Sequence, residues 1–167
     1  MVSRDDLPYR DCVGICVIGK HNKVWIGDRL GSTELQRSQH TWQMPQGGID
    51  KGENPLTAAK RELFEETSIR SVSLLKQAED WFHYDLPDDL IGIGLKGKFR
   101  GQRQCWFAFR FEGKDDEVNV INPGDGKQHQ EFQAWRWEAL ENVPDLIVPF
   151  KRGVYEQVVS SFKELVY

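Results

Sequence analysis

Three glutamates could bind a metal ion, because Glu65 and Glu66 follow Glu62 at three and four residues. On an α-helix these spacings place the side chains within an arc of roughly 100°, so the three carboxylates share one face. Like charges at such spacings destabilise a helix, and a divalent cation would compensate them. Mg²⁺ prefers oxygen ligands and often shares its shell with substrate phosphates. The pattern predicts a metal site, against the alternative of a solvated acidic face.

Local signals predict the helix that must carry these glutamates. Asn54 followed by Pro55 is typical of a helix start, and the residues up to about Thr67 are rich in helix formers. Arg61, beside the cluster, is placed to pair with Glu53 across the junction between loop and helix. Before the helix, the segment 42–48 ends in two glycines and predicts a loop whose backbone can approach another group closely.

The whole pattern resembles a known motif. Gly-x5-Glu-x7-Arg-Glu-Leu-x-Glu-Glu-x-x-Ile runs from Gly47 to Ile69 and resembles the Nudix box, with Ser68 where that family usually has Gly in the turn after the helix. The resemblance implies Mg²⁺, or Mn²⁺ or another divalent cation, held by the Gly47 carbonyl and by Glu62, Glu65 and Glu66. Gly48, Glu53 and Arg61 would be structural residues of the motif.

A carboxylate must also accept a proton from the attacking water in such a mechanism. We expect Glu62 or Glu65 to be this catalytic base, with Glu131 as a rival, and the sequence does not decide among them.

Residues outside the box resemble the branch that contains diadenosine tetraphosphate hydrolases and bacterial RNA pyrophosphohydrolases. In that branch, Glu131 matches an extra metal ligand, while Tyr84 and Arg103 match positions that contact substrate phosphates. The segment 148–155 resembles the start of the last helix, which implies base stacking by Phe150 and a phosphate contact by Lys151. Arg10 and Arg29 are further phosphate candidates by position. The alternatives are a surface role for Glu131 and for both arginines, and packing for Tyr84 and Phe150.

The resemblance implies a Mg²⁺-dependent pyrophosphohydrolase that cuts a phosphoanhydride bond. Its expected substrate is a nucleotide polyphosphate: a dinucleoside polyphosphate such as diadenosine tetraphosphate, giving ATP and AMP, or the 5′-triphosphate end of RNA, which would release pyrophosphate. Both reactions can coexist in one site. The alternative from another class is a non-catalytic nucleotide-binding module, which predicts a degraded glutamate set. All the box glutamates are present here.

The remaining chain predicts an α+β fold. A hairpin is expected from segments 12–18 and 23–26, followed by strands near 72–75, 81–86, 104–111, 118–121 and 132–137 and a closing helix at 150–165. This order indicates a mixed β-sheet between helices, similar to the Nudix α/β/α sandwich. With 167 residues, a single domain over 1–167 is expected.

Composition limits the location and the partners. No stretch approaches the roughly 20 apolar residues of a membrane span, and the first nine residues are too polar for a signal peptide, so we expect a cytoplasmic protein without a membrane partner. Three cysteines without metal-ligand spacing predict reduced, packed thiols.

A net charge of −4 disfavours binding to DNA or RNA through a global basic field. Any polyanion must therefore be met locally. Segment 96–103 holds four cations in eight residues and is the place to look for such a contact, against the alternative of a solvated loop.

Overall fold

The computed structural model describes residues 2–31 and 40–167 and contains one mixed sheet. Its path is β3 (Trp42–Gln43), β2 (Val24–Arg29), β1 (Tyr9–Ile18), β7 (Gly101–Phe111) and β5 (Val72–Gln77). Off this path, β4 (Gln46–Gly48) pairs with β1, β6 (Phe82–Asp85) with β7, and β8 (Phe132–Glu138) with β2. The central strands β1 and β7 are parallel, and the other described pairs are antiparallel. The predicted mixed sheet is confirmed.

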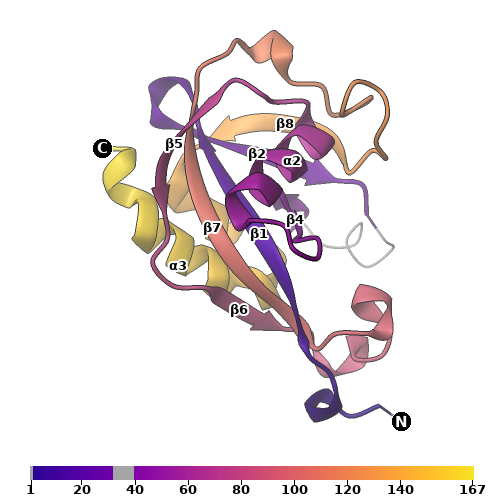
Figure 1. The fold of residues 1–167 in the computed structure, drawn as a ribbon. Coiled ribbons are helices and arrows are strands. Elements are labelled where there is room, and N and C mark those ends of the chain that lie inside the picture. The colour runs from indigo at the N-terminus through magenta and orange to yellow at the C-terminus, as the bar shows by residue number, and fades with distance from the viewer. Residues whose placement is uncertain (1, 32–39) are drawn as a thin grey trace.

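Two helices lie on opposite faces of this sheet (Figure 1). α2 (Pro55–Thr67) buries Ala58, Ala59 and Leu63 in one apolar cluster with the odd-numbered residues of β1. α3 (Arg152–Phe162) buries Val154 and Phe162 in the second cluster, on the other face. Each helix therefore covers its own side of the sheet, and the predicted α/β/α sandwich is confirmed.

Short 3₁₀ segments complete the described structure. They span Arg4–Asp6, Lys20–Asn22, Asp88–Leu90, Gly94–Gly97, Asp115–Glu117, Leu140–Asp145, Pro149–Lys151 and Lys163–Leu165. The last two flank α3, so the predicted closing helix begins and ends in 3₁₀ geometry. Among the described residues, no helix is long and apolar enough to cross a membrane. The three cysteines are buried and unpaired, as predicted, and burial raises the pKa of Cys12 and Cys16 to about 12.

The first hairpin is present, but its two strands pair only at Ile18 and Val24. The reason is that β4 occupies the first half of the same edge of β1, opposite residues 12–14. The segment 42–48 was expected to be a loop and instead contains the short strands β3 and β4.

The predicted strand at 118–121 is wrong. This segment is irregular, although Val118 and Val120 pack into the cluster under α2. Its backbone bonds to a helix end rather than to a strand, because the Asn119 N–H donates to the Thr67 carbonyl (2.9 Å). Burial of alternate residues in a loop imitates the period of a strand.

Candidate functional site

Helix α2 positions the glutamates. Its N-cap is Asn54, whose side chain accepts a hydrogen bond from the Leu56 N–H (2.9 Å), and Pro55 occupies the first turn. One cleft is lined by the three box glutamates together with residues from the loop before β8, namely Glu62, Glu65, Glu66, Gln128, His129 and Glu131. The structure therefore brings Glu131 to the box, across 65 residues of sequence from Glu66.

Burial makes negative charge costly in this cleft. Glu66 is 9% exposed, and its burial raises the pKa of the carboxyl group well above the ordinary value; the charges of Glu62 and Glu131 add to the rise. The Gln46 N–H, 3.4 Å from a Glu66 carboxylate oxygen, opposes it. Burial also raises the pKa of Glu62, against the influence of Arg61. A cation placed among these carboxylates would relieve both effects.

The backbone of β4 lies directly against functional side chains. A Cβ atom at Gly47 would overlap the carboxyl group of Glu62, and one at Gly48 would overlap the guanidinium of Arg10. Only glycine fits at these two positions without moving a neighbour. The predicted close approach of this backbone is confirmed, and the groups that it approaches are Glu62 and Arg10.

Arg61 connects the loop, the strand and the helix. Its Nε and Nη2 donate to the two carboxylate oxygens of Glu53, each at 2.8 Å, so the predicted pair is present. Nη2 also donates to the Gly48 carbonyl (2.9 Å), while Nη1 donates to Glu62 (2.8 Å) and Glu65 (3.2 Å). The hydrogen bonds from Arg61 are the main reason that the pKa of Glu53 falls to about 2. A planar, bidentate guanidinium is suited to this bridging role.

The donor set suits a hard divalent cation, since it consists of carboxylate and backbone oxygens. Glycine at 47 lets the Glu62 carboxylate lie directly against the backbone of β4, and the raised pKa of Glu66 marks the place where positive charge is favourable. Among the residues that the structure describes, no three His, Cys, Asp or Glu side chains already converge on one point. One oxygen of Glu62 and one of Glu65 are bonded to Arg61 instead.

Cationic and aromatic candidates meet on the side of the sheet that α3 covers. Lys151 is 5% exposed, donates to the Gln43 side chain (3.4 Å), and places its ammonium 5.4 Å from the Tyr84 ring centre. Burial, and next the charge of Arg29, lowers the pKa of Lys151 to about 7. Phe150 packs on Tyr84 with ring centres 5.6 Å apart. Tyr84, Arg29, Phe150 and Lys151 therefore form one group.

The two other phosphate candidates are placed differently. Arg10 lies beside Gly48, and its charge acts on both Glu62 and Tyr84, so it connects the glutamates with the aromatic group. Arg103 pairs in register with His83, whereas Tyr84 pairs with Gln102, and successive residues of a strand point to opposite faces. Arg103 instead donates to Asp11 (3.1 and 3.2 Å) and stacks on Trp81. The structure does not bring Arg103 to Tyr84.

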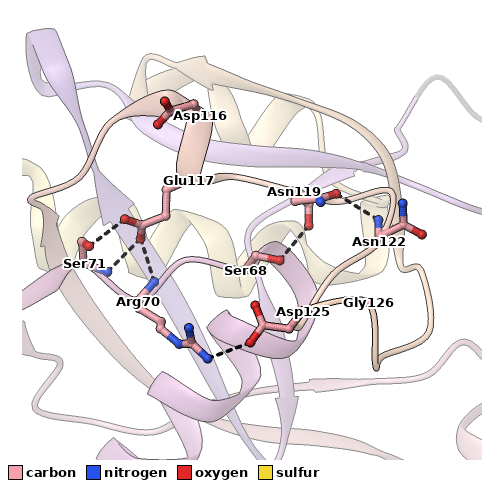
Figure 2. Close-up of a pocket in the computed structure, with 9 residues that line it drawn as sticks. All are labelled: Ser68, Arg70, Ser71, Asp116, Glu117, Asn119, Asn122, Asp125 and Gly126. Carbon is pink, nitrogen blue, oxygen red and sulfur yellow. Dashed lines mark hydrogen bonds and ion pairs between the residues drawn. The ribbon is translucent and has the colours of Figure 1, made fainter.

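Ser68 anchors the loop that leads to Glu131, and Figure 2 shows its side chain bonded to Asn119 of that loop. Its φ of 69° is the left-handed conformation that favours glycine, which explains the usual residue at this position of the box. Its Oγ donates to the Asn119 carbonyl (3.1 Å) and accepts from the Gly124 N–H (3.0 Å). Side-chain hydrogen bonds thus tie this loop to the end of α2.

Glu117 supplies the second anchor of the same loop. Its carboxylate accepts hydrogen bonds from the N–H groups of Arg70 and Ser71 and from the Ser71 hydroxyl, at 2.6 to 2.9 Å. Sequence reasoning assigned no role to Gln128 or His129, which this loop carries into the glutamate cleft. Their position two and three residues before Glu131 was the available signal.

Comparison with known proteins now decides the family, because a sequence model of the NUDIX domain matches residues 8–158. The chain belongs to the NUDIX family. It is 59% identical over 167 residues to an RNA pyrophosphohydrolase of Rhizobium meliloti (strain 1021), with 99% of each chain covered. It is 56% identical to an RNA pyrophosphohydrolase of Agrobacterium fabrum, over 98% of this chain and 97% of that protein. The predicted family and the predicted Nudix pyrophosphohydrolase enzyme are confirmed.

Solved Nudix structures share the fold at low identity. The Escherichia coli dihydroneopterin triphosphate pyrophosphohydrolase superposes with a TM-score of 0.63 at 17% identity, over 91% of this chain and 97% of the other. A Caenorhabditis elegans Ap4A hydrolase complex gives 0.58 at 16% identity, over 89% and 96%. At these identities the likeness supports the fold alone.

Proposed function

We propose that this Nudix enzyme hydrolyses the 5′-triphosphate end of RNA to a monophosphate end and pyrophosphate. The observation that carries the proposal is the cleft in which all three box glutamates and Glu131 meet, beside the group of Arg29, Tyr84, Phe150 and Lys151. Such a site combines ligands for a cation with positive charge and an aromatic surface for a nucleotide. The names of the relatives that are 59% and 56% identical support RNA as the substrate.

The Gly47 carbonyl, Glu62, Glu65, Glu66 and Glu131 would hold Mg²⁺, or Mn²⁺ or another divalent cation. Bound there, the cation neutralises charge on the phosphate oxygens and lowers the pKa of water. Glu62 or Glu65 accepts the proton of the attacking water, with Glu131 as the third candidate. Arg61 is a positioning residue, since it binds Glu53, Glu62 and Glu65 at once.

Arg10, Arg29 and Lys151 bind the phosphate chain in this proposal. In the described part of the chain, none of the three has a carboxylate within ion-pair distance. The charges of Arg10 and Arg29 therefore remain available to a substrate, and a bound phosphate would favour the protonated form of Lys151, whose pKa is lowered to about 7. Half-buried Phe150 provides the ring surface on which the first base stacks, a contact of about 1–3 kcal/mol per base, and Tyr84, which is 7% exposed, packs against Phe150. Arg103 stays a candidate phosphate contact that would first have to leave Asp11.

The test compares Mg²⁺-dependent hydrolysis of 5′-triphosphorylated RNA and of diadenosine tetraphosphate. Glu62→Gln and Glu66→Gln should each lower kcat by about 10² or more, the usual scale of a lost catalytic group. Glu141→Gln, which changes an exposed glutamate outside the cleft, is the matched control and should be fully active.

Each alternative has its own outcome in this assay. Full activity of both cleft variants would refute the metal assignment. Turnover of the dinucleotide but not of RNA would refute the proposed substrate. Tight nucleotide binding without turnover of either substrate would favour the non-catalytic module.

We also propose that residues 1–167 form one Nudix domain that acts in the cytoplasm and has no DNA partner. A single sheet that carries both helices supports the proposal of one domain. An RNA substrate supports the cytoplasmic location, because bacterial RNA is found in the cytoplasm.

A further inference from the structure

The basic segment 96–103 divides into two kinds of cation. Arg100 donates to Asp85 (3.1 Å) and covers the Tyr9 ring, and Arg103 is paired with Asp11. Lys96 and Lys98 are exposed, and the described residues offer neither of them an ion pair. Two lysines with uncompensated charge therefore remain in a protein whose net charge is −4.

These two lysines line one cavity of about 240 Å³ together with Arg10, Leu95 and Phe99. We call this cavity the lysine pocket. It combines three cationic groups with an apolar wall, because Leu95 and Phe99 are both half-buried. This is the combination of charge and apolar surface that binds single-stranded nucleic acid.

The backbone holds the lysine pocket in a costly conformation. Leu95, Lys96 and Gly97 have φ values of 53°, 59° and 71°, and two consecutive non-glycine residues rarely adopt this left-handed geometry. The turn is fixed by the hydrogen bond from the Lys98 N–H to the Leu95 carbonyl (3.2 Å) and by packing of Leu95 on the core. Lys96 and Lys98 are thus presented by a defined turn rather than by an open loop.

Arg10 joins the lysine pocket to the glutamate cleft. It lines the pocket, it lies against Gly48, and its charge acts on Glu62. The turn that carries the lysines lies beside the N-terminal end of β1, where Arg100 donates its N–H to the Pro8 carbonyl (Figure 1). A phosphate chain held by Arg10 would therefore leave the cleft next to Lys96 and Lys98.

We propose that the lysine pocket binds the RNA strand beyond its first nucleotide, with Lys96 and Lys98 on backbone phosphates. A lysine ammonium is a compact charge that suits such contacts. This inference rests on the proposed RNA substrate. A dinucleoside polyphosphate carries no phosphate outside the chain that is cut, so the pocket would distinguish RNA from that class of substrate.

The experiment uses the full chain with Mg²⁺ and the double variant K96Q/K98Q. Triphosphorylated RNAs of two and eight nucleotides and diadenosine tetraphosphate are compared. We expect KM for the eight-nucleotide RNA to rise about tenfold at low salt with kcat unchanged, because two phosphate contacts are lost. The slope of log(kcat/KM) against log salt should become shallower by about 1.4, since each phosphate contact on a single strand contributes about 0.7. Diadenosine tetraphosphate should be unaffected, and the two-nucleotide RNA, which has a single internucleotide phosphate, should lose at most one contact and show a smaller rise in KM.

The control variant is K20Q/K23Q. It removes the same charge from two exposed lysines in the turn after β1, about 30 Å from the Tyr9 end of that ten-residue strand. Equal losses in both double variants would overturn the proposal in favour of a general charge effect. Equal losses on all three substrates in K96Q/K98Q would also overturn it, because the pocket would then act on the polyphosphate itself.

A binding measurement separates this inference from the proposed reaction. Fluorescence anisotropy with a labelled 5′-monophosphorylated octanucleotide reports binding without turnover. Weaker binding by K96Q/K98Q, with binding by K20Q/K23Q unchanged, supports the pocket even if the enzyme fails to hydrolyse RNA. Hydrolysis of RNA with no effect of K96Q/K98Q on KM or binding leaves the proposed function intact and refutes the pocket.

Discussion

Replacing Lys151 with Met should stabilise the protein at acidic and neutral pH. Lys151 is buried under Tyr84 and beside Arg29, and this environment lowers its pKa from 10.5 to about 7. Met is an unbranched side chain that fits an apolar gap and carries no charge. The variant therefore removes the cost of a buried ammonium while retaining much of the packing.

The direction of this pH-dependent change in stability follows from proton binding to Lys151. Between pH 7 and 10.5 the unfolded chain holds a proton on Lys151 that the folded protein has lost, so the free energy of unfolding of the wild type rises with pH in this window. Below pH 7 both states are protonated and the folded state carries the full cost. That cost is at most about 5 kcal/mol, at about 1.4 kcal/mol per tenfold change in proton affinity. We expect Lys151→Met to be more stable by about 2–5 kcal/mol at pH 6, and the difference to be largely closed at pH 9.5.

Urea denaturation in EDTA at the two pH values measures this difference. Lys163→Met, which changes an exposed lysine just after α3, is the matched control and should show no such pH dependence. A stability gap between Lys151→Met and wild type that is the same at pH 6 and pH 9.5 would refute the reasoning. The variant should also bind triphosphorylated RNA more weakly if Lys151 contacts phosphate.

Three further variants test contacts at the site. A lysine in Arg61→Lys cannot form both the paired bonds to Glu53 and the bond to Glu62. In steady-state assays with Mg²⁺, kcat should therefore fall at least about tenfold, with a smaller change in KM. An unchanged kcat would contradict the positioning role of Arg61. Ser68→Ala keeps the left-handed backbone but loses both hydrogen bonds to the loop. Chemical denaturation should show a free energy of unfolding that is lower by about 1–3 kcal/mol. An unchanged stability would mean that other contacts hold the loop. Tyr155→Phe leaves the buried Met44 N–H without its acceptor (3.0 Å), so the same assay should show a loss of about 1–3 kcal/mol; stability equal to wild type would point to another partner for that N–H.

The parts of the site that depend on local chemistry could be predicted from the sequence. The Asn54 cap, the Pro55 start and the helix formers after them predicted α2 with the observed bounds. The same applies to the pair between Arg61 and Glu53, because both residues lie within two turns of the loop-to-helix junction. Short-range spacing is enough for such features, since helix geometry fixes where neighbouring side chains go.

Features that depend on strand register could not be predicted in the same way. Tyr84 and Arg103 both matched phosphate-contacting positions, but the pairing of His83 with Arg103 sends Arg103 to the opposite face from Tyr84. A shift of one residue in that pairing would reverse the result, and no local signal sets it. The prediction of a strand at 118–121 was wrong for a related reason, since the alternate burial of its residues comes from packing under α2 and not from a neighbouring strand.

The burial of Lys151 also could not be predicted from the sequence. Lysine is rarely buried, so composition favours an exposed side chain. Only the packing of the turn before α3 against Gln43 and Tyr84, 108 and 67 residues earlier in the chain, encloses it. The basic segment shows the same limit, because its sequence indicates four equivalent cations and the structure leaves two of them unpaired.

Ser68 and Glu117 hold the two parts of the proposed catalytic centre together. The helix that carries three of the proposed acidic ligands is also bonded, through Ser68 and Ser71 at and just after its end, to the distant segment that carries the fourth. The end of the helix and the loop should therefore move together during thermal motion. Such joint motion preserves the distances between Glu131 and the three glutamates of α2. Removing the hydrogen bonds between the loop and the end of α2 would let Glu131 move relative to Glu62, Glu65 and Glu66 without changing any of these four residues.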